Sequence, residues 1–238
     1  MCKNSAEIQS AHFGRSNEQA TLHTGVIYHV DGLQSFTSIS DSLRHYPAAV
    51  WAHLQLVLSD LKLNHPEITD IHFYSDGPVT QYCNKLNFYL RTTILHDWGF
   101  QTGSWNFFSA GHGKGAPDAI GGAVKRQADQ LVLSGIDLPD AMKLFNFLSS
   151  QQSATKFYFT DAASITQIDS RCHRSLRAIN GTMKLHQIQT DATLKLVYHD
   201  LSCYCQRPTF CSCYGLRKSR FPPREISSVS IYGCGNNS

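Results

Sequence analysis

The stretch ITDIHFYSDG, residues 68–77, decides the fold, because it places an acid directly after a short apolar run. The run predicts a buried strand, and Asp76 follows its last residue. Ligands of α/β proteins gather at the carboxyl ends of strands, which favours a functional role for this carboxylate. Asp76-Gly77 is equally typical of a turn in which Asp bonds its own backbone, so the stretch alone leaves both interpretations open.

The segments around this stretch predict an α/β fold with a mixed sheet flanked by helices. Residues 19–30 alternate between apolar and polar, and Asp31-Gly32 is a hairpin signal into a second strand that ends near Ile39. Helical spacing runs from Pro47 to about residue 64, and returns at residues 79–94 and 117–133 on either side of a strand at 104–110. A hairpin followed by strand–helix crossovers gives a sheet that is partly parallel.

Beyond Ser134 the pattern predicts a helix at 138–150, strands at 156–160 and 193–201, and a basic, proline-broken loop at 218–225. The expected division is a core of residues 1–135 and a C-terminal α+β extension of residues 136–238 with a cysteine-rich basic segment. His23 and His29 lie on the polar face of the first strand, where we expect surface side chains.

A second acid, Asp118, stands in the first turn of the helix that Pro117 opens. A carboxylate there gains about 0.3–1 kcal/mol from the helix dipole, which by itself explains its presence. Gly121 and Gly122 follow, and each interior glycine costs about 0.5–1 kcal/mol relative to alanine. The glycine pair therefore suits a close approach to the sheet or to a bound polynucleotide. Lys125 lies near the same helix face.

Asp76 and Asp118 together suit a metal site. Two acids separated along the chain by one helix and one strand could hold ions that clamp the attacking and leaving oxygens of a phosphodiester. Carboxylates and water are the ligands that Mg²⁺ and Mn²⁺ prefer. The glycine-rich GHGKG, residues 111–115, lacks the spacing of a Walker loop. Its His112 and Lys114 are candidates for phosphate or DNA contacts, or ordinary loop residues.

Four stretches carry a resemblance to known proteins: EIQSAHFG (7–14), SDGPVTQYCNK (75–85), WNFF (105–108) and HGKGAPDAIGGAVKR (112–126). They resemble stretches of uncharacterised, transposon-like animal proteins over roughly residues 7–130. The element order also looks like the ribonuclease-H-like fold of DDE-type transposases and retroviral integrases. The resemblance implies metal-dependent phosphodiester chemistry on DNA, with Asp76 and Asp118 as catalytic Mg²⁺ or Mn²⁺ ligands. It also implies a nuclear DNA-binding protein, open to homo-oligomerisation, whose DNA backbone contacts come from His112, Lys114, Lys125 and Arg126.

One acid of the resembling proteins has no counterpart in this sequence. In those proteins the first of three acids lies on a strand that ends just before the position that corresponds to Met1 here. Glu7, Asp31 and Asp41 are the local substitutes, but Asp31 fits the hairpin turn and Asp41 fits a loop or helix cap. We therefore expect an N-terminally truncated or domesticated chain that is inactive by itself, since loss of a ligand cripples a two-metal reaction. The alternative is a noncatalytic nucleic-acid-binding or protein-interaction module that works through its basic tail.

Composition sets the expected compartment and partners. Of 238 residues, 42% are hydrophobic and 16% are charged, which is typical of a folded globular protein. The sequence shows no export signal and no apolar run of membrane-spanning length, so we expect an intracellular protein without membrane contact. The net charge is +3, and the tail from residue 201 onward is basic, which suits nucleic acid or a simply solvated surface. No small-molecule substrate is indicated.

Two C-x-C pairs lie in CYCQRPTFCSC, residues 203–213, and offer enough thiolates for a tetrahedral Zn²⁺ site. Their spacing departs from the usual C-x₂₋₄-C, and reduced thiols in a compact loop are the alternative. Cys172, His173 and Cys234 could complete or replace ligands of this cluster, which consists of Cys203, Cys205, Cys211 and Cys213.

Overall fold

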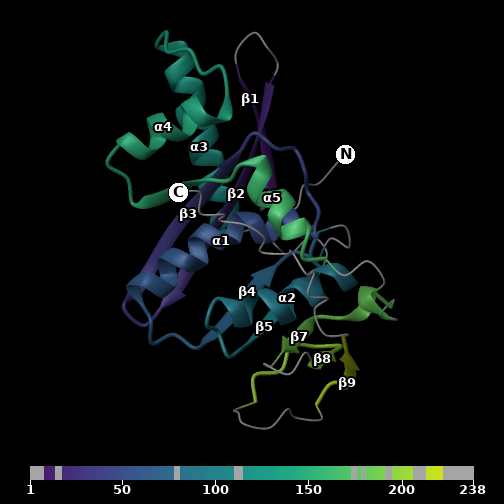
Figure 1. Ribbon diagram of the computed structural model, residues 1–238. Coiled ribbons are helices and arrows are strands. Elements are labelled where there is room, and N and C mark those ends of the chain that lie inside the picture. The colour runs from purple at the N-terminus through teal and green to yellow at the C-terminus, as the bar shows by residue number, and fades with distance from the viewer. Residues whose placement is uncertain are drawn as a thin grey trace, which may run out of the picture.

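The computed structural model describes residues 8–13, 18–77, 81–109, 115–172, 176–177, 179, 181–190, 195–205 and 213–221. Figure 1 shows these residues as β-sheets with helices packed around them. Sheet A has the strand order β1-β2-β3-β6, and sheet B has the order β4-β5-β7-β8-β9. The predicted class, a mixed α/β fold with helices flanking mixed sheets, is confirmed, although the described strands form two sheets and not one.

Sheet A is antiparallel except for its last pair, β3 and β6, which is parallel. Its members are β1 (Ile8–Phe13), β2 (Glu18–His29), β3 (Gly32–Ser40) and β6 (Thr155–Phe159). The predicted hairpin is present as β2 and β3, but the register pairs His29 with Gly32, so the turn lies at Val30 and Asp31, one residue earlier than expected. Gly32 has a φ of 144°, a conformation that favours glycine, and this lets the chain re-enter a strand directly after Asp31.

Sheet B combines one parallel pair, β4 and β5, with antiparallel strands from later in the chain. Its members are β4 (Asp70–Ser75), β5 (Thr102–Phe107), β7 (Gln187–Thr190), β8 (Lys195–His199) and β9 (Arg217–Arg220). The sequence did not indicate β7, and it placed the start of a basic loop where β9 lies. That expectation was wrong for residues 218–220, because pairing with β8 stabilises a strand in spite of its basic side chains.

Helices connect and cover the two sheets. They are α1 (Pro47–Asn64), α2 (Lys85–Asp97), α3 (Ala116–Leu133), α4 (Ala141–Ser150), α5 (Ala162–Asp169) and the 3₁₀ turn η1 (Thr182–Lys184). α2 begins later than the predicted residue 79, because the Asn84 side chain caps it by accepting hydrogen bonds from Leu86 and Asn87 N–H, both at 3.0 Å. None of the described helices combines the length and apolar character that crossing a membrane requires.

The larger hydrophobic core lies where α1 and α2 meet sheet B. Trp51 of α1 packs edge-on against Trp105 of β5, with ring centroids 5.7 Å apart, and its indole N–H donates to the Asn87 Oδ1 at 2.7 Å. A second core holds α3 and α4 on sheet A, where Ala20, Leu22 and Ile39 are fully buried. The helices α3 and α4 therefore cover the face of β2 that carries its even-numbered residues.

The opposite face of β2 is covered as well, by α1. His23 is 5% exposed and stacks on His53 of α1, with ring centroids 5.3 Å apart. The expectation that His23 lies at the surface was wrong, because α1 packs over the face that alternation alone marks as polar. Burial lowers the pKa of the His23 imidazole to about 4, so this side chain is neutral in the folded protein near pH 7.

Candidate metal and nucleic-acid sites

Asp76 lies directly after β4, at the carboxyl end of the parallel pair β4 and β5. Ser75 holds the chain there, because its hydroxyl accepts from the Trp105 indole N–H and donates to the Asp76 carbonyl, both at 2.8 Å. The Asp76 Oδ1 is buried and has no hydrogen-bond donor among the described residues. A carboxylate oxygen shielded from water without a donor is a candidate ligand for a cation.

Asp118 lies in the first turn of α3, as predicted. Its backbone N–H donates to the Gly115 carbonyl at 3.1 Å, which starts the helix without a side-chain cap. The Thr24 hydroxyl of β2 donates to the Pro117 carbonyl at 2.9 Å, and this bond ties the beginning of α3 to sheet A. The half-buried Asp118 carboxylate is therefore positioned by a helix start that is anchored on a strand.

The two acids predicted to form one site interact in the folded protein. Burial raises the pKa of the Asp76 carboxyl, and the negative charge of Asp118 raises it further. The causes of this shift are the partial burial of Asp76 and the repulsion between its negative charge and that of Asp118. A divalent cation between them would remove both costs, and oxygen ligands of this kind suit Mg²⁺ or Mn²⁺.

The remaining residues of α3 place positive charge near Asp118. Gly121 is buried on the side of α3 that packs against β2, which supports the packing explanation for this glycine. Gly122 leaves room for Arg126, whose guanidinium lies 3.3 Å from the position of an added Cβ and so reaches back toward the first turn. Lys125 is half-buried and Arg126 is exposed. His112 and Lys114, the other predicted DNA contacts, lie outside the described residues.

The cysteine cluster is partly described. The Sγ atoms of Cys203, Cys205 and Cys213 all lie within 4.8 Å of one another, and those of Cys205 and Cys213 are 4.0 Å apart. Cys211, His173 and Cys234 lie outside the described residues. Cys172 lies elsewhere, beyond the C-terminal end of α5. The chain thus brings together three thiols that could hold a metal ion such as Zn²⁺.

Gln187 of β7 anchors this cluster to sheet B. The Gln187 side-chain amide donates to the Asn106 Oδ1 and to the Cys203 carbonyl, both at 2.9 Å, and accepts from the Cys203 N–H at 3.0 Å. At the other end, the His199 Nδ1 lies 2.9 Å from the Cys213 carbonyl. Buried and partly buried hydrogen bonds therefore hold two of the cysteines in place from the sheet side, and nothing in the sequence signalled this role for Gln187.

A further group of potential ligands went unrecognised in the sequence. The donor atoms of His29, Asp31 and His65 lie within 4.8 Å of one another. The only sequence signal is their position: His29 is the next-to-last residue of a predicted strand, Asp31 belongs to the turn signal, and His65 follows a predicted helix. Their proximity becomes visible once the hairpin register and the end of α1 are known.

Comparison with known proteins identifies a family but no characterised relative. A family model described as a domain of unknown function (DUF8701) matches residues 1–202, which include Asp76, Asp118 and the His29, Asp31 and His65 group. No curated protein and no solved structure gives a significant match. The matched range ends just before Cys203, so the cysteine cluster lies outside it. The chain therefore belongs to the DUF8701 family.

Proposed function

We propose that this chain is a transposase- or integrase-derived domain with a ribonuclease-H-like core, suited to metal-dependent phosphodiester chemistry on DNA. The observation that carries the proposal is the interaction between Asp76, at the end of a strand, and Asp118, at the start of a helix. These positions are the ones that the resemblance to DDE-type enzymes assigns to the second and third acids.

The chemistry follows from the ligands. Mg²⁺ or Mn²⁺ bound by Asp76 and Asp118 would polarise a phosphodiester and stabilise its developing negative charge. The buried Asp76 Oδ1, which has no donor among the described residues, suits direct coordination. Arg126 and Lys125 lie further along the same helix as Asp118, where positive side chains can hold a DNA backbone in register.

The two open strand edges fit a missing strand of such a fold. Among the described strands, β4 pairs only with β5, and residues 24–29 of β2 pair only with β3. Thr24 contacts the start of α3 next to Asp118, and the His29 ring lies 4.6 Å from that of His65, in the segment before β4. Residues 24–29 of β2 therefore run from the start of α3 toward His65, whereas β4 runs from the segment after His65 toward Asp76.

A strand inserted between them, parallel to β4, would join sheets A and B and end near Asp76. We propose that such a strand, from outside the described residues, supplies the first acid. The described residues hold two of the three acids, and we propose that the domain is inactive without the third.

Mn²⁺ calorimetry tests the acid pair. The chain carrying His65→Gln is the reference, so that the imidazole group near the hairpin does not contribute. We expect Asp76→Asn and Asp118→Asn each to weaken Mn²⁺ binding by at least about tenfold, because each removes one charged ligand. Asp129→Asn makes an equal charge change at an exposed position of α3 and serves as the control. This variant should bind Mn²⁺ with unchanged affinity. Unchanged binding in both site variants would refute the proposed metal pair.

One observation favours the noncatalytic alternative, a nucleic-acid-binding module. In β8 and β9, Lys195 lies directly opposite Arg220, and Lys218 projects from the same face as Arg220. All three side chains are exposed. Like charges directly opposite each other destabilise a strand pair, so this arrangement suits a surface that binds a polyanion such as a DNA backbone.

Salt-dependent DNA binding distinguishes this alternative from the first proposal. If β9 makes the contacts, Arg220→Gln should weaken binding and lower the salt slope by about one, whereas Asp76→Asn should have no effect. Lys143→Gln, on the exposed side of α4, is the charge-matched control. Equal DNA affinity of the Arg220→Gln and Lys143→Gln variants would rule out a contact through β9.

A further inference from the structure

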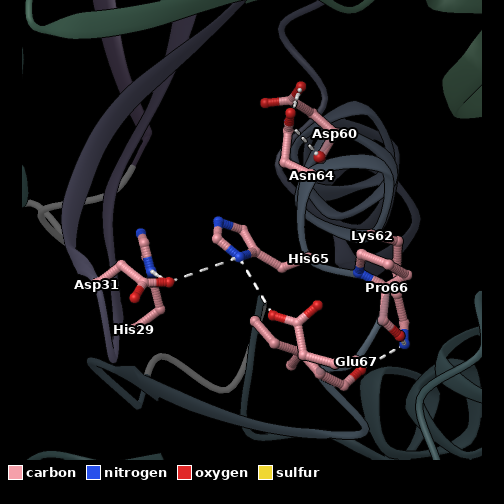
Figure 2. A network of polar contacts seen from close by, with 9 residues as sticks. His29, Asp31, Asp60, Lys62, Asn64, His65, Pro66 and Glu67 are labelled. Carbon is pink, nitrogen blue, oxygen red and sulfur yellow. Dashed lines mark hydrogen bonds and ion pairs between the residues drawn. The ribbon is translucent and has the colours of Figure 1, made fainter.

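His29, Asp31 and His65 meet at the tip of the β2–β3 hairpin. His29 is the last residue of β2, Asp31 lies in the turn, and His65 is the first residue after α1. Figure 2 shows the His65 ring between the Asp31 carboxylate and that of Glu67, which lies in the link from α1 to β4. Potential ligands from two parts of the chain therefore converge on one place.

The donor atoms of this group lie close together, but Asp31 is not within hydrogen-bond distance of either ring. The Asp31 Oδ2 lies 3.8 Å from the His29 Nδ1 and 4.0 Å from the His65 Nδ1, both too long for hydrogen bonds. The His29 Nδ1 is buried and has no hydrogen-bond partner in the part of the chain that the structure describes. A buried ring nitrogen without a partner is costly, and a metal ion would satisfy it.

We propose that His29, Asp31 and His65 form a Zn²⁺ site, with Glu67 or water in the fourth position. Two imidazoles and a carboxylate are a ligand set that Zn²⁺ accepts, whereas Mg²⁺ prefers oxygen alone. Ligands at about 2.1 Å from a tetrahedral ion lie about 3.4 Å apart. The Glu67 Oε1 is 3.3 Å from the His65 Nδ1, in a hydrogen bond that coordination of His65 through this nitrogen would replace, and the Asp31 carboxylate would have to move closer to both rings.

The backbone on the α1 side of this site is held in place. The His65 N–H donates to the Leu61 carbonyl at 2.8 Å, and the His65 carbonyl accepts from the Ile68 N–H at 3.2 Å. On the other side, the Asp31 side chain is 67% exposed, which gives an ion a path from solvent. A bound ion would fasten the hairpin tip to the segment that leads into β4, at the end of β4 opposite Asp76. This role does not depend on the proposed DNA chemistry.

Zn²⁺ binding to a chain in which the acid pair and the cysteine cluster are both disabled tests the site. The background is the full chain with Asp76→Asn and with serine in place of Cys203, Cys205, Cys211 and Cys213. We expect calorimetry to show one Zn²⁺ per chain, and Co²⁺ to give the absorption of a tetrahedral site without thiolate charge transfer. Adding His29→Gln or His65→Gln should lower Zn²⁺ affinity by at least about tenfold.

The matched control is His96→Gln, which changes an exposed histidine near the end of α2 and should leave Zn²⁺ binding unaltered. Circular dichroism confirms that each variant is folded. Where a histidine variant does not fold, Asp31→Asn takes its place, because this exposed turn residue can change without disturbing the core. A background chain that binds no Zn²⁺, or equal affinity in folded site and control variants, would overturn the proposal.

Discussion

Two histidine pairs lie between β2 and the α1 segment, and their surroundings differ. The inner pair, His23 and His53, is buried, with ring centroids 5.3 Å apart and ring planes 13° apart. The outer pair, His29 and His65, has centroids 4.6 Å apart and planes at 47°. Histidines of β2 therefore face histidines of the α1 segment twice, once inside a core and once at a solvent-exposed hairpin tip.

The neighbours of each pair decide what it can do. The His53 Nδ1 lies 2.8 Å from the Ser38 hydroxyl, which in turn lies 2.8 Å from that of Thr160, so the inner pair contacts neutral groups. Burial lowers the pKa of both inner imidazoles. The outer pair has the carboxylates of Asp31 and Glu67 beside it. The nearby carboxylates and the access to water make the outer pair a candidate set of metal ligands. The inner pair lacks both and forms a polar contact inside the core.

We expect the largest difference between the two histidine pairs in how Zn²⁺ changes the stability of the chain. In the Asp76→Asn chain that also carries serine at the four clustered cysteines, free Zn²⁺ at about a hundred times its dissociation constant should raise the free energy of unfolding by about 3 kcal/mol. The gain should vanish with His29→Gln and persist with His23→Leu, as measured by urea denaturation with and without Zn²⁺. Loss of the gain in a folded His23→Leu chain would show that the pairs do not act separately.

Low pH should destabilise the folded chain through the inner pair, His23 and His53. The unfolded chain protonates His23 near pH 6.5, whereas the folded chain does so only near pH 4, so stability is present above pH 6.5 and is lost as pH falls toward 4. His23 alone should cost about 2 kcal/mol between pH 7 and pH 5. Urea denaturation in EDTA should show a smaller pH dependence for His23→Leu than for His96→Gln. Equal slopes in these two variants would contradict the assignment.

Removing a polar neighbour should affect the two pairs unequally in the absence of metal. Ser38→Ala leaves a buried imidazole nitrogen and the Thr160 hydroxyl without their shared partner, and should cost about 1–2 kcal/mol. Glu67→Gln changes an exposed side chain and should stay within about 0.5 kcal/mol. Thermal unfolding at pH 7 in EDTA measures both changes. Similar losses would mean that the outer network contributes as much to folding as the inner one.

The smallest effect concerns the acid pair, Asp76 and Asp118. Its contribution to stability depends on pH in the opposite direction to that of His23. Because the pKa of Asp76 is raised in the folded chain, stability is lost as pH rises through that pKa. Asp118→Asn removes one cause of the shift and should lower the pKa of the Asp76 carboxyl toward its usual value, a change that corresponds to less than about 1 kcal/mol. An NMR titration of Asp76 in EDTA checks the direction, with Asp129→Asn as the charge control. An unchanged pKa of Asp76 in the Asp118→Asn chain would argue against repulsion between the two acids.

Local sequence signals predicted the β2–β3 hairpin, the start of α1 and the positions of the two acids. Alternation and the Asp31-Gly32 signal located the β2–β3 hairpin to within one residue, and Pro47 located the start of α1. Asp76 and Asp118 were expected to meet because one follows a strand and the other opens a helix. These signals involve neighbouring residues, so they persist without knowledge of the tertiary structure.

Features that depend on contacts between distant segments could not be predicted. β7 and β9 have four residues each, and their pairing with longer strands, not their own propensity, makes them strands. His23 was expected at the surface because alternation cannot reveal that α1 covers the second face of β2. The His29, Asp31 and His65 group needs both the hairpin register and the end of α1 to within about one residue.

The parallel pairing of β3 with β6 has a consequence for how the chain folds during synthesis. The hydroxyls of Ser35 and Thr155 are 3.1 Å apart across this pair, although 120 residues separate them in sequence. At about 5–20 residues per second, a ribosome needs on the order of ten seconds between the two strands. Throughout that interval the outer edge of β3 lacks this partner, and an open strand edge is a template for association with other chains. The nascent protein therefore exposes this edge until β6 has left the ribosome.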